Sequence, residues 1–130
     1  MPEPTYPKDL RYHEEHGWAR IDGDRATFGI TWYAQNSLGE VIFYEGSEVG
    51  VAVQKDSAYA EVESVKAISN VIAPLSGEVT AVNPELGNAP ERINEDPYGQ
   101  GWTIMMRLSA PSEAEVLLDA AQYRKLVEGH

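Results

Sequence analysis

Lys66 is the residue whose type and position point most directly to chemistry. Around it, residues 58–63 alternate in a way that predicts a strand, with the even-numbered side chains from Ala58 onward buried and the odd-numbered ones, Tyr59 included, exposed. A second apolar run at 71–73 stops at Pro74, so Lys66 is predicted to lie at or beside a hairpin turn. An amine held there is accessible to a modifying enzyme. Most lysines in turns are ordinary solvated residues, however, and the spacing alone does not decide.

The run His13-Glu14-Glu15-His16 is a second candidate, because imidazoles and carboxylates bind metal ions. A polar run near a terminus is more often a solvated edge, and the only further histidine is His130. We therefore expect no metal site. The chain has no cysteine and no G-x-S-x-G, P-loop or G-x-G-x-x-G motif, so we predict no catalytic residue.

Length and composition restrict the classes of protein. We predict one domain over the 130 residues 1–130, with a core from about 10 to 110 and a helical segment at 112–128. An apolar content of 42% argues against a disordered tail, and a net charge of −11 disfavours nucleic acid and anionic membranes as partners. The N-terminus lacks signal-peptide features and no stretch has the apolar length of a membrane span. These features predict a bacterial cytosolic protein, or a mitochondrial matrix protein if a transit peptide was removed.

The pattern between Ile21 and Leu108 predicts a mainly β fold. Short apolar-alternating runs are interrupted there by Gly, Pro, Asn and Asp. A short helix is predicted to begin after the capping residue Thr31 and to end at Gly39. The strands predicted around this helix lie at 18–21, 26–30 and 41–44.

The C-terminal segment is predicted to be helical. Ser112 and Glu115 have the spacing of a capping box, and apolar side chains recur from Leu117 onward. Because the apolar face slips near Asp119, the segment is predicted to form one helix or two short ones. Just before this segment, Trp102 is predicted to pack in the core.

Several blocks of the sequence carry a resemblance to a known family. The blocks are Gly29–Thr31, Tyr33–Gln35, Leu38–Val41, Glu48–Gly50, Glu61–Ala67, Ala73–Val79 and Asn94–Trp102. In this order they resemble the glycine cleavage system H protein family, and the similarity runs over most of the chain. The resemblance implies a barrel-sandwich hybrid, mainly β, with a short internal helix and a C-terminal helix. It also implies that lipoate is attached to Lys66 as N6-lipoyllysine.

The resemblance further implies a set of partners. Glycine decarboxylase would load an aminomethyl group on a lipoyl sulfur, aminomethyltransferase would pass the carbon to tetrahydrofolate, and dihydrolipoamide dehydrogenase would reoxidise the dithiol. A lipoylating enzyme would first attach the cofactor. The chain is then a non-catalytic carrier in glycine catabolism and one-carbon metabolism, expected to act as a monomer. Biotin is disfavoured because Val65 and Ala67 stand where biotin carriers have methionines.

Three positions depart from the family pattern. Gly17 stands where the family has the glutamate of a His-Glu-Trp motif, Asn70 where it has an aspartate, and Trp32 where it has a polar residue. Two of the family's carboxylates line the cleft that shelters the charged arm, so that sheltering is expected to be weaker here. Glu14 or Glu15 is the neighbouring carboxylate that could take over.

Two alternatives remain open from the sequence. The chain could be an H-like lipoate carrier of another pathway, such as sulfur oxidation, or an interaction scaffold that is not lipoylated. Turnover with glycine decarboxylase and aminomethyltransferase would exclude the first alternative. Absence of modification would indicate the second.

Overall fold

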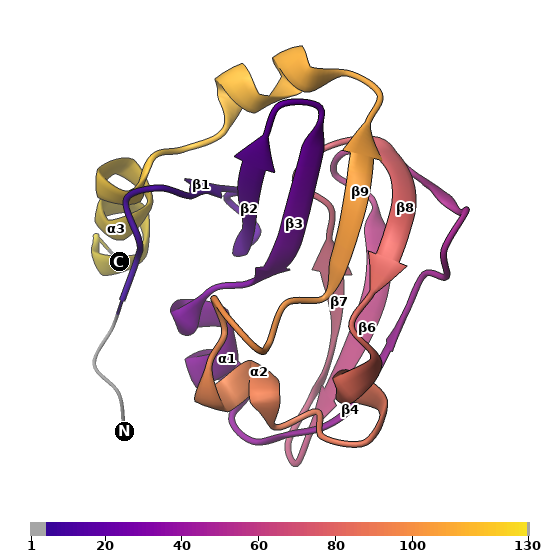
Figure 1. Cartoon of the computed structure of the whole chain (residues 1–130). Coiled ribbons are helices and arrows are strands. Elements are labelled where there is room, and N and C mark those ends of the chain that lie inside the picture. Colours follow the sequence, from indigo (N-terminus) through magenta and orange to yellow (C-terminus); the bar gives the residue numbers. More distant parts are fainter. Residues whose placement is uncertain (1–4, 130) are drawn as a thin grey trace.

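Two antiparallel sheets form the frame of the molecule (Figure 1). The computed structural model describes residues 5–129. The six strands of the larger sheet are, in spatial order, β1 (Arg11–Tyr12), β2 (Gly17–Asp22), β3 (Arg25–Ile30), β9 (Ile104–Leu108), β8 (Gly77–Val82) and β5 (Ala52–Val53). The smaller sheet contains β4 (Val41–Gly46), β6 (Ala58–Ser64) and β7 (Ile68–Ile72), with β6 in the centre. The mainly β prediction is confirmed.

Short helices connect and flank the sheets. They are α1 (Trp32–Leu38), the 3₁₀ helix η1 (Pro84–Gly87), α2 (Arg92–Glu95), the 3₁₀ helix η2 (Pro111–Val116) and α3 (Ala120–Glu128). The hydroxyl of Thr31 accepts a hydrogen bond from the N–H of Ala34 at 3.2 Å, and α1 ends at Gly39, whose φ of 82° suits glycine. Both predicted ends of this helix are confirmed. None of the helices within residues 5–129 is long and apolar enough to cross a membrane.

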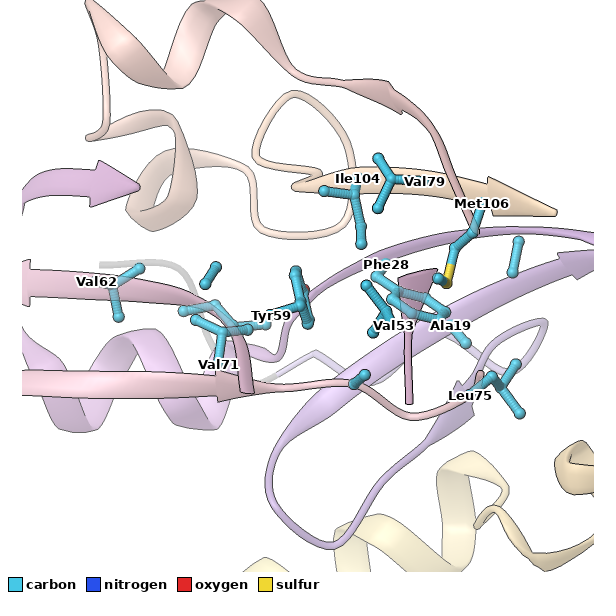
Figure 2. Close-up of a cluster of buried hydrophobic side chains, with 14 of the residues drawn as sticks. Ala19, Phe28, Val53, Tyr59, Val62, Val71, Leu75, Val79, Ile104 and Met106 are labelled. Atoms are coloured by element: carbon cyan, nitrogen blue, oxygen red, sulfur yellow. The ribbon is translucent and has the colours of Figure 1, made fainter. Parts of the chain in front are cut away.

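The main core lies between the two sheets. Phe28, Ile104 and Met106 come from the larger sheet and Val62 and Val71 from the smaller one, and all are buried (Figure 2). Their close packing removes large apolar surfaces from water, which is the main source of stability in a fold of this size. This core holds the hairpin β6–β7, and therefore Lys66, against the rest of the molecule.

A smaller aromatic cluster lies where α3 packs near β1 and β2. Tyr12, Trp18 and Tyr123 are fully buried there, and the rings of Tyr12 and Tyr123 are stacked with centroids 4.9 Å apart. Trp102 packs against this cluster, as predicted, but its side chain is only half-buried. The prediction that it belongs to the core is therefore only partly correct. The cluster ties the C-terminal helix to the larger sheet.

The burial predicted along β6 is partly wrong. Tyr59 is 4% exposed and Ala58 is exposed, the reverse of the predicted alternation. A register shift between Ala58 and Ala60 in the pairing with β7 changes which side chains face the core. The Tyr59 hydroxyl lies 2.7 Å from the hydroxyl of Thr103, which satisfies its buried polar group.

The C-terminal segment forms two short helices, η2 and α3, which is the second of the two predicted possibilities, and they are separated just before Ala120. The predicted capping box at Ser112 and Glu115 is wrong, because η2 has no side-chain cap. The true capping box belongs to α3: Asp119 accepts from the N–H of Gln122 at 2.8 Å, and Gln122 accepts in return at 2.9 Å.

Candidate functional site

Lys66 lies at the tip of the hairpin that joins β6 to β7, as predicted. Val65, Lys66 and Ala67 form the turn, and all three are exposed. Among residues 5–129, the Nζ atom of Lys66 has no ion-pair partner. Paired strands thus present a free amine at a fixed place on the surface.

The hydroxyl of Ser64 closes this turn. Its Oγ accepts hydrogen bonds from the backbone N–H groups of Lys66 at 3.3 Å and Ala67 at 3.1 Å. The N–H of Ser64 in turn donates to the carbonyl of Ala67 at 2.8 Å. A hydroxyl that bonds to backbone groups two and three residues ahead stabilises a turn by itself. The hairpin therefore forms without the Asn-Gly pair that is typical of two-residue turns.

A second anchor joins the tip to the loop after α1. The N–H of Val65 donates to the carbonyl of Glu40 at 3.2 Å. That loop is held by Asn94 of α2, whose side chain donates to the carbonyl of Gly39 at 2.8 Å and accepts from the N–H of Val41 at 2.8 Å. The position of the tip thus depends on three segments that are distant in sequence.

We expect Ser64→Ala to loosen the tip while the fold persists. The substitution removes the acceptor of two N–H groups, which costs about 1 kcal/mol because water can partly replace it. Hydrogen exchange at the Ala67 amide should accelerate about fivefold, and exchange in β2 and β3 should be unchanged. Ser69→Ala is the matched control, since Ser69 only donates to its neighbour Asn70 at 3.3 Å. Equal exchange at Ala67 in both variants would contradict the role of Ser64.

A cleft of about 330 Å³ lies beside Lys66. One wall is the edge strand β7 together with Ala67, the opposite wall is α1, and the loop before β2 closes the end. The lining is largely apolar, and among the described residues it contains a single carboxylate, that of Glu15. The lining residues are Glu15, His16, Gly17, Ile30, Tyr33, Ala34, Ser37, Leu38, Val62, Ala67, Ile68, Ser69, Asn70, Val71 and Ile72.

Two of the three departures from the family pattern line this cleft. Gly17 and Asn70 both do, although neither carries a charge. Trp32 does not, because it is half-buried against the aromatic cluster. Of the two neighbouring carboxylates, Glu15 lines the cleft and Glu14 does not. Among residues 5–129, Glu15 is therefore the one carboxylate in the cleft walls that a cationic group can pair with.

His13 fixes the backbone of Glu15. The ring is buried, its Nδ1 accepts from the N–H of Glu15 at 2.9 Å, and its Nε2 lies 2.6 Å from Oδ1 of Asp56. Because Nδ1 accepts, the proton is on Nε2, which donates to Asp56. Hydrogen bonds from His13 and from Lys55 lower the pKa of the Asp56 carboxyl. The turn that carries Glu15 is thereby attached to the loop before β6.

His16 takes part in a separate network. Its Nδ1 lies 2.8 Å from the hydroxyl of Tyr123, which is also 2.8 Å from the hydroxyl of Thr31. Burial raises the pKa of Tyr123, so this residue remains a neutral hydrogen-bonding group. Within residues 5–129, no three His, Asp or Glu side chains are grouped to hold a metal ion, and His130 lies outside the described residues. Through the hydroxyl of Tyr123, the C-terminal helix α3 holds one wall of the cleft, α1, and the loop before β2 that closes its end.

Three positioning residues were missed by sequence reasoning. Ser64 had one local signal, its place two residues before Lys66 in a turn without Asn-Gly. Asn94 was named only as part of a block that carries the family resemblance, and Tyr123 had no signal, because their hydrogen bonds span 53 or more positions of the chain. Their importance follows only from the packing of the helices.

Comparisons with known proteins agree with this geometry. Residues 10–130 match the sequence model of the family described as Glycine cleavage H-protein. A glycine cleavage system H protein of Acidobacterium capsulatum is 51% identical over 124 residues, with 95% of each chain covered. One of Brevibacillus brevis is 46% identical over 123 residues, covering 95% of this chain and 98% of its own.

The fold leads to the same family. The crystal structure of a glycine cleavage system H protein from Mycobacterium marinum superposes with a TM-score of 0.85 at 35% identity, covering 95% of this chain and 99% of the other. This match confirms the barrel-sandwich hybrid expected from the sequence. The chain belongs to the glycine cleavage H-protein family, whose members are non-catalytic lipoyl carriers of the glycine cleavage system.

Proposed function

We propose that Lys66 is the lipoylated residue of this chain and that residues 1–130 act as one carrier domain. The observation that supports the assignment is the exposed amine at the tip of β6–β7, directly beside a cleft with largely apolar walls. The other lysines do not combine these features. Lys55 is paired with Asp56, and neither Lys8 nor Lys125 is next to a residue that lines the cleft, whereas Lys66 is followed by Ala67, which does.

The residues around Lys66 suit a lipoyl group. The attached arm would extend roughly 14 Å from the backbone, which is similar to the length of the five-residue strand β7 beside the cleft. Aliphatic side chains such as Leu38 and Val71 offer contacts for its hydrocarbon part, and Glu15 offers a partner for a cationic load. When bound, the lipoyl group supplies two sulfur atoms that alternate between disulfide and dithiol and carry an aminomethyl group between enzymes.

The partners proposed for this carrier are glycine decarboxylase, aminomethyltransferase, dihydrolipoamide dehydrogenase and a lipoylating enzyme. This chain contributes a tether, a docking surface and a shelter. A tethered group is presented to a docked enzyme at an effective concentration in the millimolar range, so its load need not diffuse freely. We propose a monomer that docks transiently in the cytosol.

The intact mass of the protein tests the assignment to Lys66. The chain is coexpressed with a lipoate ligase in medium that contains lipoate, beside the variants Lys66→Arg and Lys125→Arg. Addition of one lipoyl group is expected for the unchanged chain and for Lys125→Arg, and none for Lys66→Arg. Lipoylation of Lys66→Arg would place the cofactor elsewhere, and no addition to any of the three would favour the unlipoylated scaffold.

A further inference from the structure

Four large apolar side chains are exposed around Lys66. They are Ile42 and Phe43, each 48% exposed, Val65 at 67% and Ile68 at 63%. Side chains of this kind normally lie in the core, and single exposed ones need no explanation. Four of them beside one turn form an apolar patch, which is typical of a surface that another protein covers.

The strand register accounts for this grouping. Phe43 of β4 is opposite Glu63 of β6, and Glu63 is opposite Ile68 of β7, so the three side chains share one face of the smaller sheet. A register shift between Val41 and Phe43 leaves Ile42 exposed as well. The patch is therefore built into the sheet beside the tip, and we call it, with Val65, the hairpin surface (Ile42, Phe43, Val65 and Ile68).

Carboxylates lie next to the hairpin surface. Glu45 and Glu61 are directly opposite each other on β4 and β6, and both are exposed. Like charges in this arrangement destabilise a sheet, and among residues 5–129 neither forms an ion pair. The stability of the sheet therefore does not explain why two glutamates lie opposite each other here. A partner with basic side chains around an apolar contact complements it.

We propose that the hairpin surface docks the enzyme that attaches lipoate to Lys66, through an apolar contact with a basic rim. The proposal rests on the assignment of lipoate to Lys66. Before modification, the lysine side chain reaches only about 6 Å from the backbone, so the enzyme must cover the neighbours of Lys66 to reach Nζ. Enzymes that act on the end of the finished arm, roughly 14 Å away, can dock elsewhere.

The chemistry of attachment places the contribution of this chain in binding. With lipoate activated as its adenylate, Nζ attacks the acyl carbon, the amide bond forms, the bond from acyl carbon to the adenylate oxygen breaks, and AMP leaves. The proton of Nζ goes to a base of the enzyme or to water. The step requires no further group of this chain, so loss of the hairpin surface should change KM and leave kcat nearly unchanged.

The apolar part is tested with Phe43→Thr and Val65→Thr, which keep a β-branched residue or create one. The control is Val116→Thr, since Val116 is 70% exposed in η2, at the end of the molecule opposite the hairpin tip (Figure 1). Initial rates are measured by intact mass with a purified bacterial lipoate–protein ligase, lipoate and ATP. We expect KM to rise about tenfold in each test variant, with kcat within about twofold and the control unchanged.

The charged part is tested with the double variant Glu45→Gln/Glu61→Gln. Its KM should rise about threefold at low ionic strength and approach that of the unchanged chain at high salt, because screening removes the attraction in both. Circular dichroism and thermal unfolding verify that every variant is folded. Unchanged KM values in folded variants, with the unchanged chain still lipoylated, would overturn the docking proposal alone. Failure to lipoylate the unchanged chain would overturn the assignment of Lys66.

Discussion

Lys66→Arg should abolish glycine turnover when it replaces the unchanged chain in a reconstituted glycine cleavage system. The guanidinium group stays protonated at neutral pH and is no nucleophile, so no amide to lipoate forms. Without the tether, the partner enzymes lose the millimolar effective concentration of the arm. Glycine-dependent reduction of NAD should fall to the rate measured without carrier.

The controls separate loss of the arm from loss of the fold. Lys66 is exposed and forms no ion pair within the described residues, so the substitution should leave thermal unfolding unchanged. Lys125→Arg should support full turnover. Substantial turnover with Lys66→Arg would exclude Lys66 as the essential attachment site, whereas no turnover with the lipoylated unchanged chain would favour a carrier of another pathway.

Local signals in the sequence predicted much of the frame. The strands at 18–21 and 26–30, the cap at Thr31 and the end of α1 at Gly39 were all foreseen, because each depends on residues only a few positions apart. The hairpin around Lys66 was predicted for the same reason. The family resemblance supplied the arrangement of the two sheets, which local patterns do not define.

Features that depend on distant contacts were not predicted correctly. Tyr59 is buried because a register shift between β6 and β7 reverses the expected alternation. Glu113 accepts hydrogen bonds from the backbone and hydroxyl of Ser76 at 2.8 and 3.0 Å, and thereby links η2 to the loop before β8. The helix η2 begins at Pro111 without a side-chain cap, so the capping pattern at Ser112 gave the wrong helix start.

The candidate site likewise has one part that the sequence predicted and one part that it did not. Lys66 was identified from its strand context and the resemblance, yet the cleft beside it is assembled from β7, α1 and the loop before β2. From the sequence, Glu14 and Glu15 were equal candidates to replace the family's carboxylates in the cleft. The structure shows that Glu15 lines the cleft, in a turn whose backbone is fixed by His13. Which side chain reaches a cleft depends on backbone direction, which composition does not define.

Gly77→Ala should cause a large loss of stability. Gly77 is buried at the start of β8, opposite Leu108 of β9 and Val53 of β5. A Cβ atom there would lie 2.2 Å from the carbonyl oxygen of Arg107, and backbone cannot move aside as a flexible side chain can. Overpacking of this kind costs about 3 kcal/mol, out of a total of about 5–15 kcal/mol for a domain. The melting temperature should fall by about 10 °C.

Gly87→Ala is the matched control for this prediction. Gly87 ends η1, and a Cβ atom there would have no heavy atom within 4 Å. Its φ also lies outside the left-handed region, so alanine should be neutral or stabilise the protein by about 0.5 kcal/mol through the unfolded chain. Urea denaturation of both variants gives the comparison. Equal midpoints would mean that β8 and β9 can separate at little cost, and the close approach at Gly77 would then not explain the glycine.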